Sequence, residues 1–222
     1  MKHLTNNSLQ HVFPPGFWRA VTTCLVLGII GGCSTTSAPE KAAPVANLEV
    51  VEEIGFTITE QQVVDETVDA EYREALRLLE QGLVDEGILQ LQLVTETVPG
   101  LAAPQIDLGV AYHIAGDLEA AETHLQKAIE LNPAHPVAHN ELGIIYRKTG
   151  RFAEARQSYE AALDIYPGYH YARRNLAILC DLYLADPSCA LKNYEAYMAT
   201  VPNDEEVEIW IADLRLRTGN QE

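Results

Sequence analysis

Basic residues are scarce in this sequence. Among its 222 residues, 15 are Lys or Arg and 32 are Asp or Glu, so the formal charge at pH 7 is −17. Sequence-independent binding to nucleic acid needs clustered Lys and Arg side chains, and electrostatic binding to anionic lipid needs a basic patch. The composition therefore argues against nucleic-acid partners and against attachment to a membrane by charge.

Long apolar runs and common enzyme motifs are also missing. No stretch reaches the roughly 18 apolar residues of a membrane-spanning helix. The sequence has no Gly-Lys pair of a phosphate-binding loop, no Gly-x-Ser-x-Gly elbow and no His-Glu-x-x-His zinc motif. His135 and His139 are four residues apart, but the first precedes a proline in an expected turn. We therefore predict no catalytic residue, no metal site, no cofactor and no small-molecule substrate.

An apolar run is nevertheless present near the N-terminus, at residues 20–30. Lys2 and Arg19 are the only Lys, Arg, Asp or Glu residues before it. The core of an export signal has about 7–15 apolar residues, whereas a spanning helix needs about 20. This region therefore predicts an export signal rather than a transmembrane helix.

The run ends in the sequence Ile30-Gly31-Gly32-Cys33, which resembles the bacterial lipobox. The resemblance implies that residues 1–32 are a lipoprotein signal peptide and that Cys33 carries palmitate and other acyl chains. Two acyl chains are enough for stable anchoring. Ser34, in place of Asp, implies sorting to the periplasmic face of the outer membrane. The alternative is an ordinary signal peptide with a chance cysteine.

Residues 33–58 lack the apolar period of a helix and predict the lipidated N-terminus and a flexible tether. Within them, Val50–Ile58 predicts a short strand-like or irregular segment that docks on the folded domain. Thr59 and Gln62 resemble a capping box, so we expect helix from about Glu60.

Four prolines recur at a nearly constant spacing, 34, 34 and 35 residues apart: Pro99, Pro133, Pro167 and Pro202. Other positions recur in step with them. One set is Leu108, Gly109, Tyr112, Gly116, Ala121, Leu125 and Ala128, and the next is Leu142, Gly143, Tyr146, Gly150, Ala155, Tyr159 and Ala162. The pattern resembles the tetratricopeptide repeat (TPR) family over roughly residues 68–218.

The resemblance implies an all-α fold, a right-handed helical solenoid of about four helix-turn-helix units and a C-terminal capping helix. The small residues Gly109 and Ala121 then lie where the two helices of a unit cross. We expect nine helices within a TPR domain at 59–222. The units are expected at about 68–101, 102–135, 136–169 and 170–204, and the cap at 205–218.

Two cysteines, Cys180 and Cys189, lie on either side of the expected turn of the fourth unit. If the protein is exported, the oxidising compartment favours a disulfide between them. Two buried thiols that act as small apolar side chains are the alternative.

TPR solenoids bind peptides or partner proteins in a concave groove lined by the first helix of each unit. Arg173 and Arg174 either meet a carboxylate of the partner there or pair within the domain. The resemblance carries the groove over to Ala103, Ile106, Val110, His113, Val137, Asn140, Ile144, Arg147, Tyr171, Arg174, Asn175, Ile178 and Asp181.

These features predict a non-catalytic scaffold that is lipid-anchored in the periplasm and binds another envelope protein or peptide segment. It resembles TPR lipoproteins that assist pilus or secretion secretins, or trans-envelope energy-transducing complexes. One alternative is an accessory that recruits or regulates a cell-wall or polysaccharide enzyme. Another is a cytoplasmic co-chaperone in which Cys33 is incidental.

Overall fold

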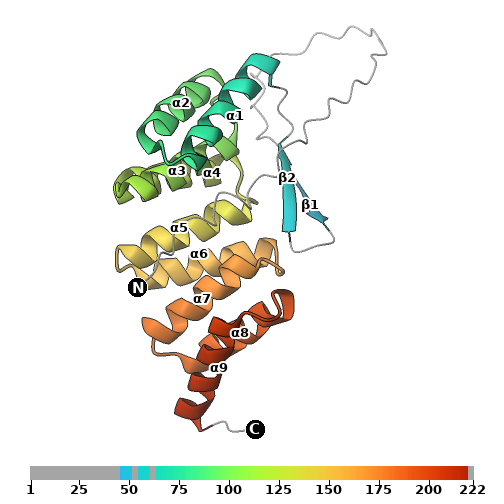
Figure 1. Cartoon of the computed structure of the whole chain (residues 1–222), viewed down its shortest axis with the longest axis vertical. Helices are drawn as coiled ribbons and strands as arrows, with labels where there is room; N and C mark the ends of the chain where they lie inside the picture. Colours follow the sequence, from blue (N-terminus) through green and yellow to red (C-terminus); the bar gives the residue numbers. More distant parts are fainter. Residues whose placement is uncertain (1–45, 52–54, 61–63, 220–222) are drawn as a thin grey trace, which may run out of the picture. The chain divides into compact units, whose positions relative to one another are not determined.

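The computed structural model describes residues 46–51, 55–60 and 64–219 (Figure 1). The predicted signal peptide, the lipobox and Cys33 lie outside the described residues. None of the described helices is long and apolar enough to cross a membrane.

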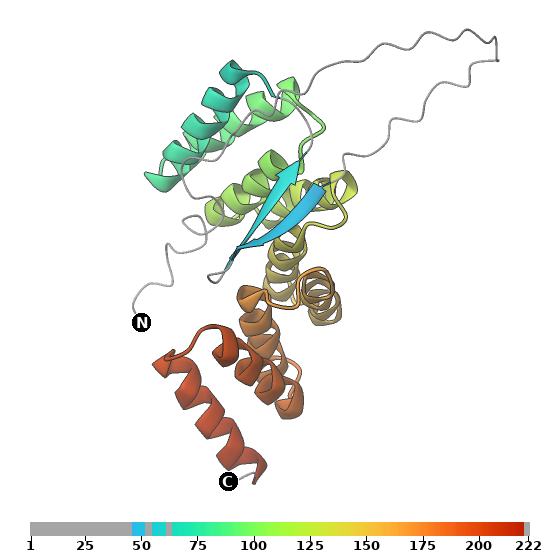
Figure 2. The same cartoon turned by 90° about the vertical axis from the view of Figure 1, so that its right-hand side faces the viewer.

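Nine helices follow one another in the described residues 64–219. They are α1 (Glu66–Glu80), α2 (Val84–Thr97), α3 (Ala102–Ala115), α4 (Leu118–Leu131), α5 (Pro136–Lys148), α6 (Phe152–Ile165), α7 (His170–Leu182), α8 (Pro187–Thr200) and α9 (Glu205–Thr218). The first eight pack as consecutive pairs, and the second helix of each pair also contacts the first helix of the next (Figures 1 and 2). The predicted all-α TPR solenoid is confirmed.

Each pair crosses at a small residue. A Cβ atom on Gly109 would lie 2.5 Å from Leu125 Cγ and 3.2 Å from the carbonyl oxygen of Ala121, and one on Gly143 would lie 2.6 Å from the Tyr159 ring. Ala177 has the corresponding place in α7 and is fully buried. The recurring small residues are therefore required by the close approach of the two helices, as the repeat pattern predicted.

The turn inside a unit needs a left-handed residue. Gly116 ends α3 with φ at 89°, a conformation that glycine adopts without the steric cost of a side chain. The next residue, Asp117, accepts a hydrogen bond from the Ala120 amide and so caps α4. Gly116 in the left-handed conformation ends the first helix, and the N-cap Asp117 begins the second. The chain therefore reverses within two residues, and the second helix packs back on the first.

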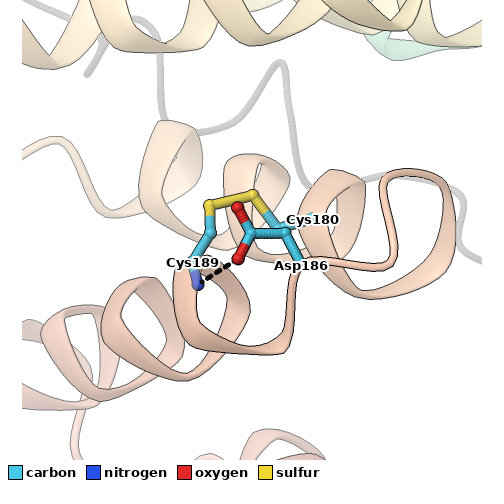
Figure 3. Close-up of side chains that lie close together, drawn as sticks. All are labelled: Cys180, Asp186 and Cys189. Atoms are coloured by element: carbon cyan, nitrogen blue, oxygen red, sulfur yellow. Dashed lines mark hydrogen bonds between the residues drawn. A yellow bond between two sulfur atoms is a disulfide. The ribbon is translucent and has the colours of Figure 1, made fainter.

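The fourth unit replaces this turn with a longer one closed by a disulfide. Its left-handed residue is Ala185, with φ at 51°. Asp186 caps α8 by accepting a hydrogen bond from the Cys189 amide at 3.0 Å. Cys180 of α7 and Cys189 of α8 are bonded, with their Cα atoms 5.8 Å apart (Figure 3).

The region before α1 differs from our expectation of helix from about Glu60. Strand β2 (Gly55–Glu60) pairs antiparallel with β1 (Ala46–Val51), and β2 crosses the boundary we predicted between residues 58 and 59. The helix begins only at Glu66, where the Asp65 side chain accepts hydrogen bonds from two backbone amides. The sequence of β2, GFTITE, is rich in β-branched and aromatic residues, which favour a strand over a helix.

Candidate peptide-binding groove

The first helices of the four units, α1, α3, α5 and α7, contact one another in sequence order and form a common face. Residues 34 apart have the same place on this face. One such row is Tyr72, Ile106, Asn140 and Arg174, and the neighbouring row is Arg73, Asp107, Glu141 and Asn175. The predicted groove residues belong to these rows and to the positions beside them.

The two middle units bury this face deeply. Ile106 and Asn140 are each 2% exposed and Val110 is 7% exposed, and Val137 is also buried. These predicted contact residues are therefore packed between the helices and offer a partner almost no surface; we call them the floor of this first-helix face. The predicted residues that remain partly exposed are Ala103, His113, Ile144, Arg147, Tyr171, Arg174, Asn175, Ile178 and Asp181.

Side-chain hydrogen bonds connect neighbouring units along the floor. Asn175 of α7 donates from Nδ2 to Asn140 Oδ1 at 3.0 Å, and Asn140 donates from Nδ2 to Glu141 Oε1 at 3.0 Å. In the first half of the solenoid, the Tyr72 hydroxyl donates to the Asp107 carboxylate. Buried polar groups of this kind specify one arrangement of neighbouring units, because leaving any of them without a partner is costly.

Burial also changes the charge of the floor. It raises the pKa of the Asp107 carboxyl to about 7 and the pKa of the Glu141 carboxyl to about 7. Burial, together with the nearby cations Lys148 and Arg147, lowers the pKa of His113 to about 4. At mildly acidic pH all three groups are mainly neutral, so they add little charge to this face.

The arginines of this face contact other residues of the domain. Arg174 lies 3.1 Å from the Glu206 carboxylate and stacks over the Trp210 ring of α9 at 5.1 Å from its centroid. Arg173 donates to Asn193 Oδ1 at 3.2 Å. Arg174 thus pairs with an acidic neighbour within the domain, one of the two alternatives from the sequence, whereas Arg173 is bound by an amide. Arg147 lies over the Tyr183 ring, at 5.8 Å from the centroid.

Neither candidate metal-binding arrangement has the form of a zinc site. His135 is buried at the start of α5, and the His139 ring lies 2.9 Å from the Pro133 carbonyl oxygen. One group of three ligand-type side chains occurs in the part of the chain that the structure describes: Cys180, Asp186 and Cys189 (Figure 3). Thiolates are the metal-binding form of cysteine, and here both sulfurs are joined in a disulfide.

Sequence reasoning missed the buried carboxylates of the floor. Asp107 is 2% exposed and lies in α3 among buried apolar neighbours on either side, Ile106 and Leu108. A carboxylate inside such an apolar run was the available signal. One unit later, Glu141 has the same repeat position and lies between the buried residues Asn140 and Leu142.

Comparison with known proteins agrees with this architecture. The tetratricopeptide repeat family model matches residues 70–136 and 106–170. No curated relative matches the sequence. Among solved structures, PilF of Pseudomonas aeruginosa is similar with a TM-score of 0.64 and 23% identity, over 70% of this chain and 71% of that chain.

Two further structures show the same likeness. MamA of Desulfovibrio magneticus RS-1 has a TM-score of 0.62 and 18% identity, over 71% of this chain and 88% of that one. The thermophilic TPR protein TTC0263 of Thermus thermophilus has a TM-score of 0.58 and 24% identity, over 68% and 82%. At these identities the likeness concerns the fold. Because the family model matches them, residues 70–170 carry tetratricopeptide repeats. The similar structures show in addition that helices α1 to α9 form a TPR solenoid.

Proposed function

We propose that this protein is a non-catalytic scaffold whose groove holds a segment of another envelope protein. The observation that carries the proposal is the common face of α1, α3, α5 and α7, where a buried floor is bordered by partly exposed apolar, aromatic and polar side chains. Such a surface suits an extended or helical peptide, whose apolar side chains enter the groove while its polar groups meet the border.

The border favours a peptide that carries both aromatic and polar groups. Tyr171 and Ile178 offer apolar area on α7, and Asn175 offers an amide beside them. Because Arg174 already pairs with Glu206, a carboxylate of the partner has to compete with an internal one. The partner segment is therefore selected chiefly by apolar contact and hydrogen bonds.

We also propose that the scaffold is anchored by lipid on Cys33 to the periplasmic face of the outer membrane. The lipobox-like sequence supports the anchor, and the Cys180–Cys189 disulfide fits an oxidising compartment. In this setting the protein assists the assembly or operation of an envelope machine, such as a pilus or secretion secretin or a trans-envelope energy-transducing complex.

A photoreactive amino acid placed at Ile144 in the groove is expected to form a crosslinked product with a partner in native cells. The control position is Leu89 on the second helix α2, which is 62% exposed and outside the first-helix face. We expect at least about tenfold more product from position 144, the ratio that corresponds to 1.4 kcal/mol of preference. Equal yields from the two positions would place the binding surface elsewhere.

Radioactive palmitate is expected to label the wild-type protein in cells, and Cys33→Ala is expected to lose the label completely. Cys24→Ala is the matched control, because that cysteine lies in the predicted signal peptide and is removed with it. Label should therefore persist in Cys24→Ala. An unlabelled wild-type protein, or undiminished label in Cys33→Ala, would contradict the proposed anchor.

A further inference from the structure

Helix α9 occupies the place of the first helix in a fifth unit. Helices α3, α5 and α7 begin at Ala102, Pro136 and His170, one repeat apart, and α9 begins at Glu205, one repeat later when the extra residue of the fourth unit is included. It contacts α8 as the other first helices contact the second helix before them. Among the described residues, no helix follows α9 (Figure 1).

In a complete unit, one face of the first helix is covered by the second helix. In α3 that face contains Gln105, Leu108, Gly109 and Tyr112, and Gly109 approaches Leu125 of α4. The same repeat positions in α9 are Glu208, Ile211, Ala212 and Arg215.

These four residues of α9 line an open hollow of about 360 Å³, together with Glu195 and Met198 of α8. Of the two central residues, Ile211 is 9% exposed but Ala212 is exposed, whereas Ala75 and Ala177 at the same repeat position as Ala212 are 0% exposed. Met198 lies one repeat after Leu163, which is 7% exposed. The hollow is therefore the vacant site of a second helix, with an apolar floor.

The charges on this face are arranged symmetrically. Glu208 and Arg215 lie at equal distances in sequence on either side of the central pair, Ile211 and Ala212. Two copies of such a helix, packed antiparallel, bring Glu208 of each against Arg215 of the other and place the small Ala212 at the crossing. Arg215 already lies 2.8 Å from Glu195 of α8, so it would sit between two carboxylates.

We propose that this α9 face docks a second copy of the protein, packed antiparallel about a two-fold axis between Ile211 and Ala212. A two-fold interface requires one patch that complements itself, and the order Glu208, Ile211, Ala212, Arg215 has this property. The contact covers a face of α9 that no other described helix covers. It does not depend on the groove or on the proposed function.

The size of the patch indicates a weak dimer. Stable interfaces bury about 1,600 Å² in total, or roughly 800 Å² on each partner. One face of a 14-residue helix and the edge of α8 offer less than this. We therefore expect the dimer to depend on concentration and to be captured best by crosslinking in cells, where the full chain is present.

The test is an engineered disulfide between copies of the full chain. Ala212→Cys is expected to give a covalent dimer on a non-reducing gel, since residue 212 lies next to the axis and therefore close to the same residue of the other copy. The matched control is Ala153→Cys, an exposed alanine on α6. We expect at least about tenfold more dimer from Ala212→Cys. Equal or absent dimer, or a product of another mass, would overturn the proposal.

A charge exchange tests the pairing itself. In the Ala212→Cys background, Arg215→Glu places like charges opposite each other and is expected to reduce the dimer at least about tenfold. Adding Glu208→Arg restores opposite charges and is expected to recover it, with circular dichroism showing that each variant is folded. A dimer yield unaffected by Arg215→Glu, or not recovered in the exchanged variant, would contradict the antiparallel arrangement.

Discussion

Replacing Leu125 with alanine is expected to lower the free energy of unfolding by about 2–5 kcal/mol. Leu125 is 0% exposed and fills the space beside Gly109, where α3 and α4 cross. The truncation removes its buried methyl groups and leaves a cavity, because two helices held at such short distance collapse only partly. Chemical denaturation followed by circular dichroism measures the loss.

Leu93→Ala is the matched control, since Leu93 lies on the second helix α2 but is 54% exposed. Its effect should stay within about 0.5 kcal/mol. A double-mutant cycle sharpens the result: Gly109→Ala should destabilise the wild-type protein and cost less in the Leu125→Ala background, where only the Ala121 carbonyl oxygen, at 3.2 Å, still crowds the Cβ atom. Equal costs in both backgrounds would show that the two residues do not limit the crossing.

The two buried carboxyls of the floor, Asp107 and Glu141, are expected to stabilise the folded state less and less as the pH rises from about 4 to about 7. Burial raises the pKa of Asp107 to about 7 and that of Glu141 to about 7, so the folded state holds two protons that the unfolded chain releases near its ordinary values of 3.8 and 4.5. Their contribution is complete below those ordinary values and disappears as the pH passes the folded pKa values. At 1.36 kcal/mol per pKa unit, each group contributes on the order of 3–4 kcal/mol.

Asp107→Asn and Glu141→Gln keep the accepting oxygens for Tyr72 and Asn140 but remove the ionisation. Each should be more stable than the wild type at pH 8, and the difference should shrink with falling pH and disappear below the ordinary pKa values of 3.8 and 4.5. Glu160→Gln on the exposed surface of α6 is the control and should leave the pH profile unchanged. A stability difference between each variant and the wild type that does not increase with pH would contradict this prediction.

Buried histidines produce the opposite slope at lower pH. Burial, together with the neighbouring His139, lowers the pKa of His135 to about 3. Below pH 6.5 the unfolded chain therefore binds a proton at this side chain, whereas the folded protein does not. The free energy of unfolding therefore decreases as the pH falls from 6.5 to about 3. Together the carboxyls and the histidines place the maximum of stability in mildly acidic solution.

The repeat architecture could be predicted from the sequence because its determinants are local and recur. Gly109 and Gly143 are fixed by a helix crossing, and Gly116 by a left-handed turn, so each leaves a mark at a constant spacing. The start of α1 could not be placed in the same way. There, Thr59 and Gln62 match the capping-box pattern in sequence, but the residues up to Glu60 prefer a strand. The side chain of Asp65 caps the helix, which therefore begins at Glu66.

The groove was harder to predict, because its character depends on how neighbouring units pack. Asn140 has the appearance of a polar contact residue in sequence, yet in the structure it joins Asn175 to Glu141 within a buried network. Arg174 likewise finds Glu206 and Trp210 on α9, more than thirty residues away. Such long-range pairings leave no periodic trace in the sequence.

The Cys180–Cys189 disulfide has a mechanical consequence. Each unit of a solenoid contacts only its neighbours, so a stretched chain lengthens by releasing its helices in succession. The disulfide joins residues nine positions apart, so under tension the segment between them cannot extend. At about 3.3–3.6 Å per extended residue, this withholds roughly 30 Å of contour length. The first three units can unravel completely, whereas the fourth keeps its turn closed under load until the sulfurs are reduced.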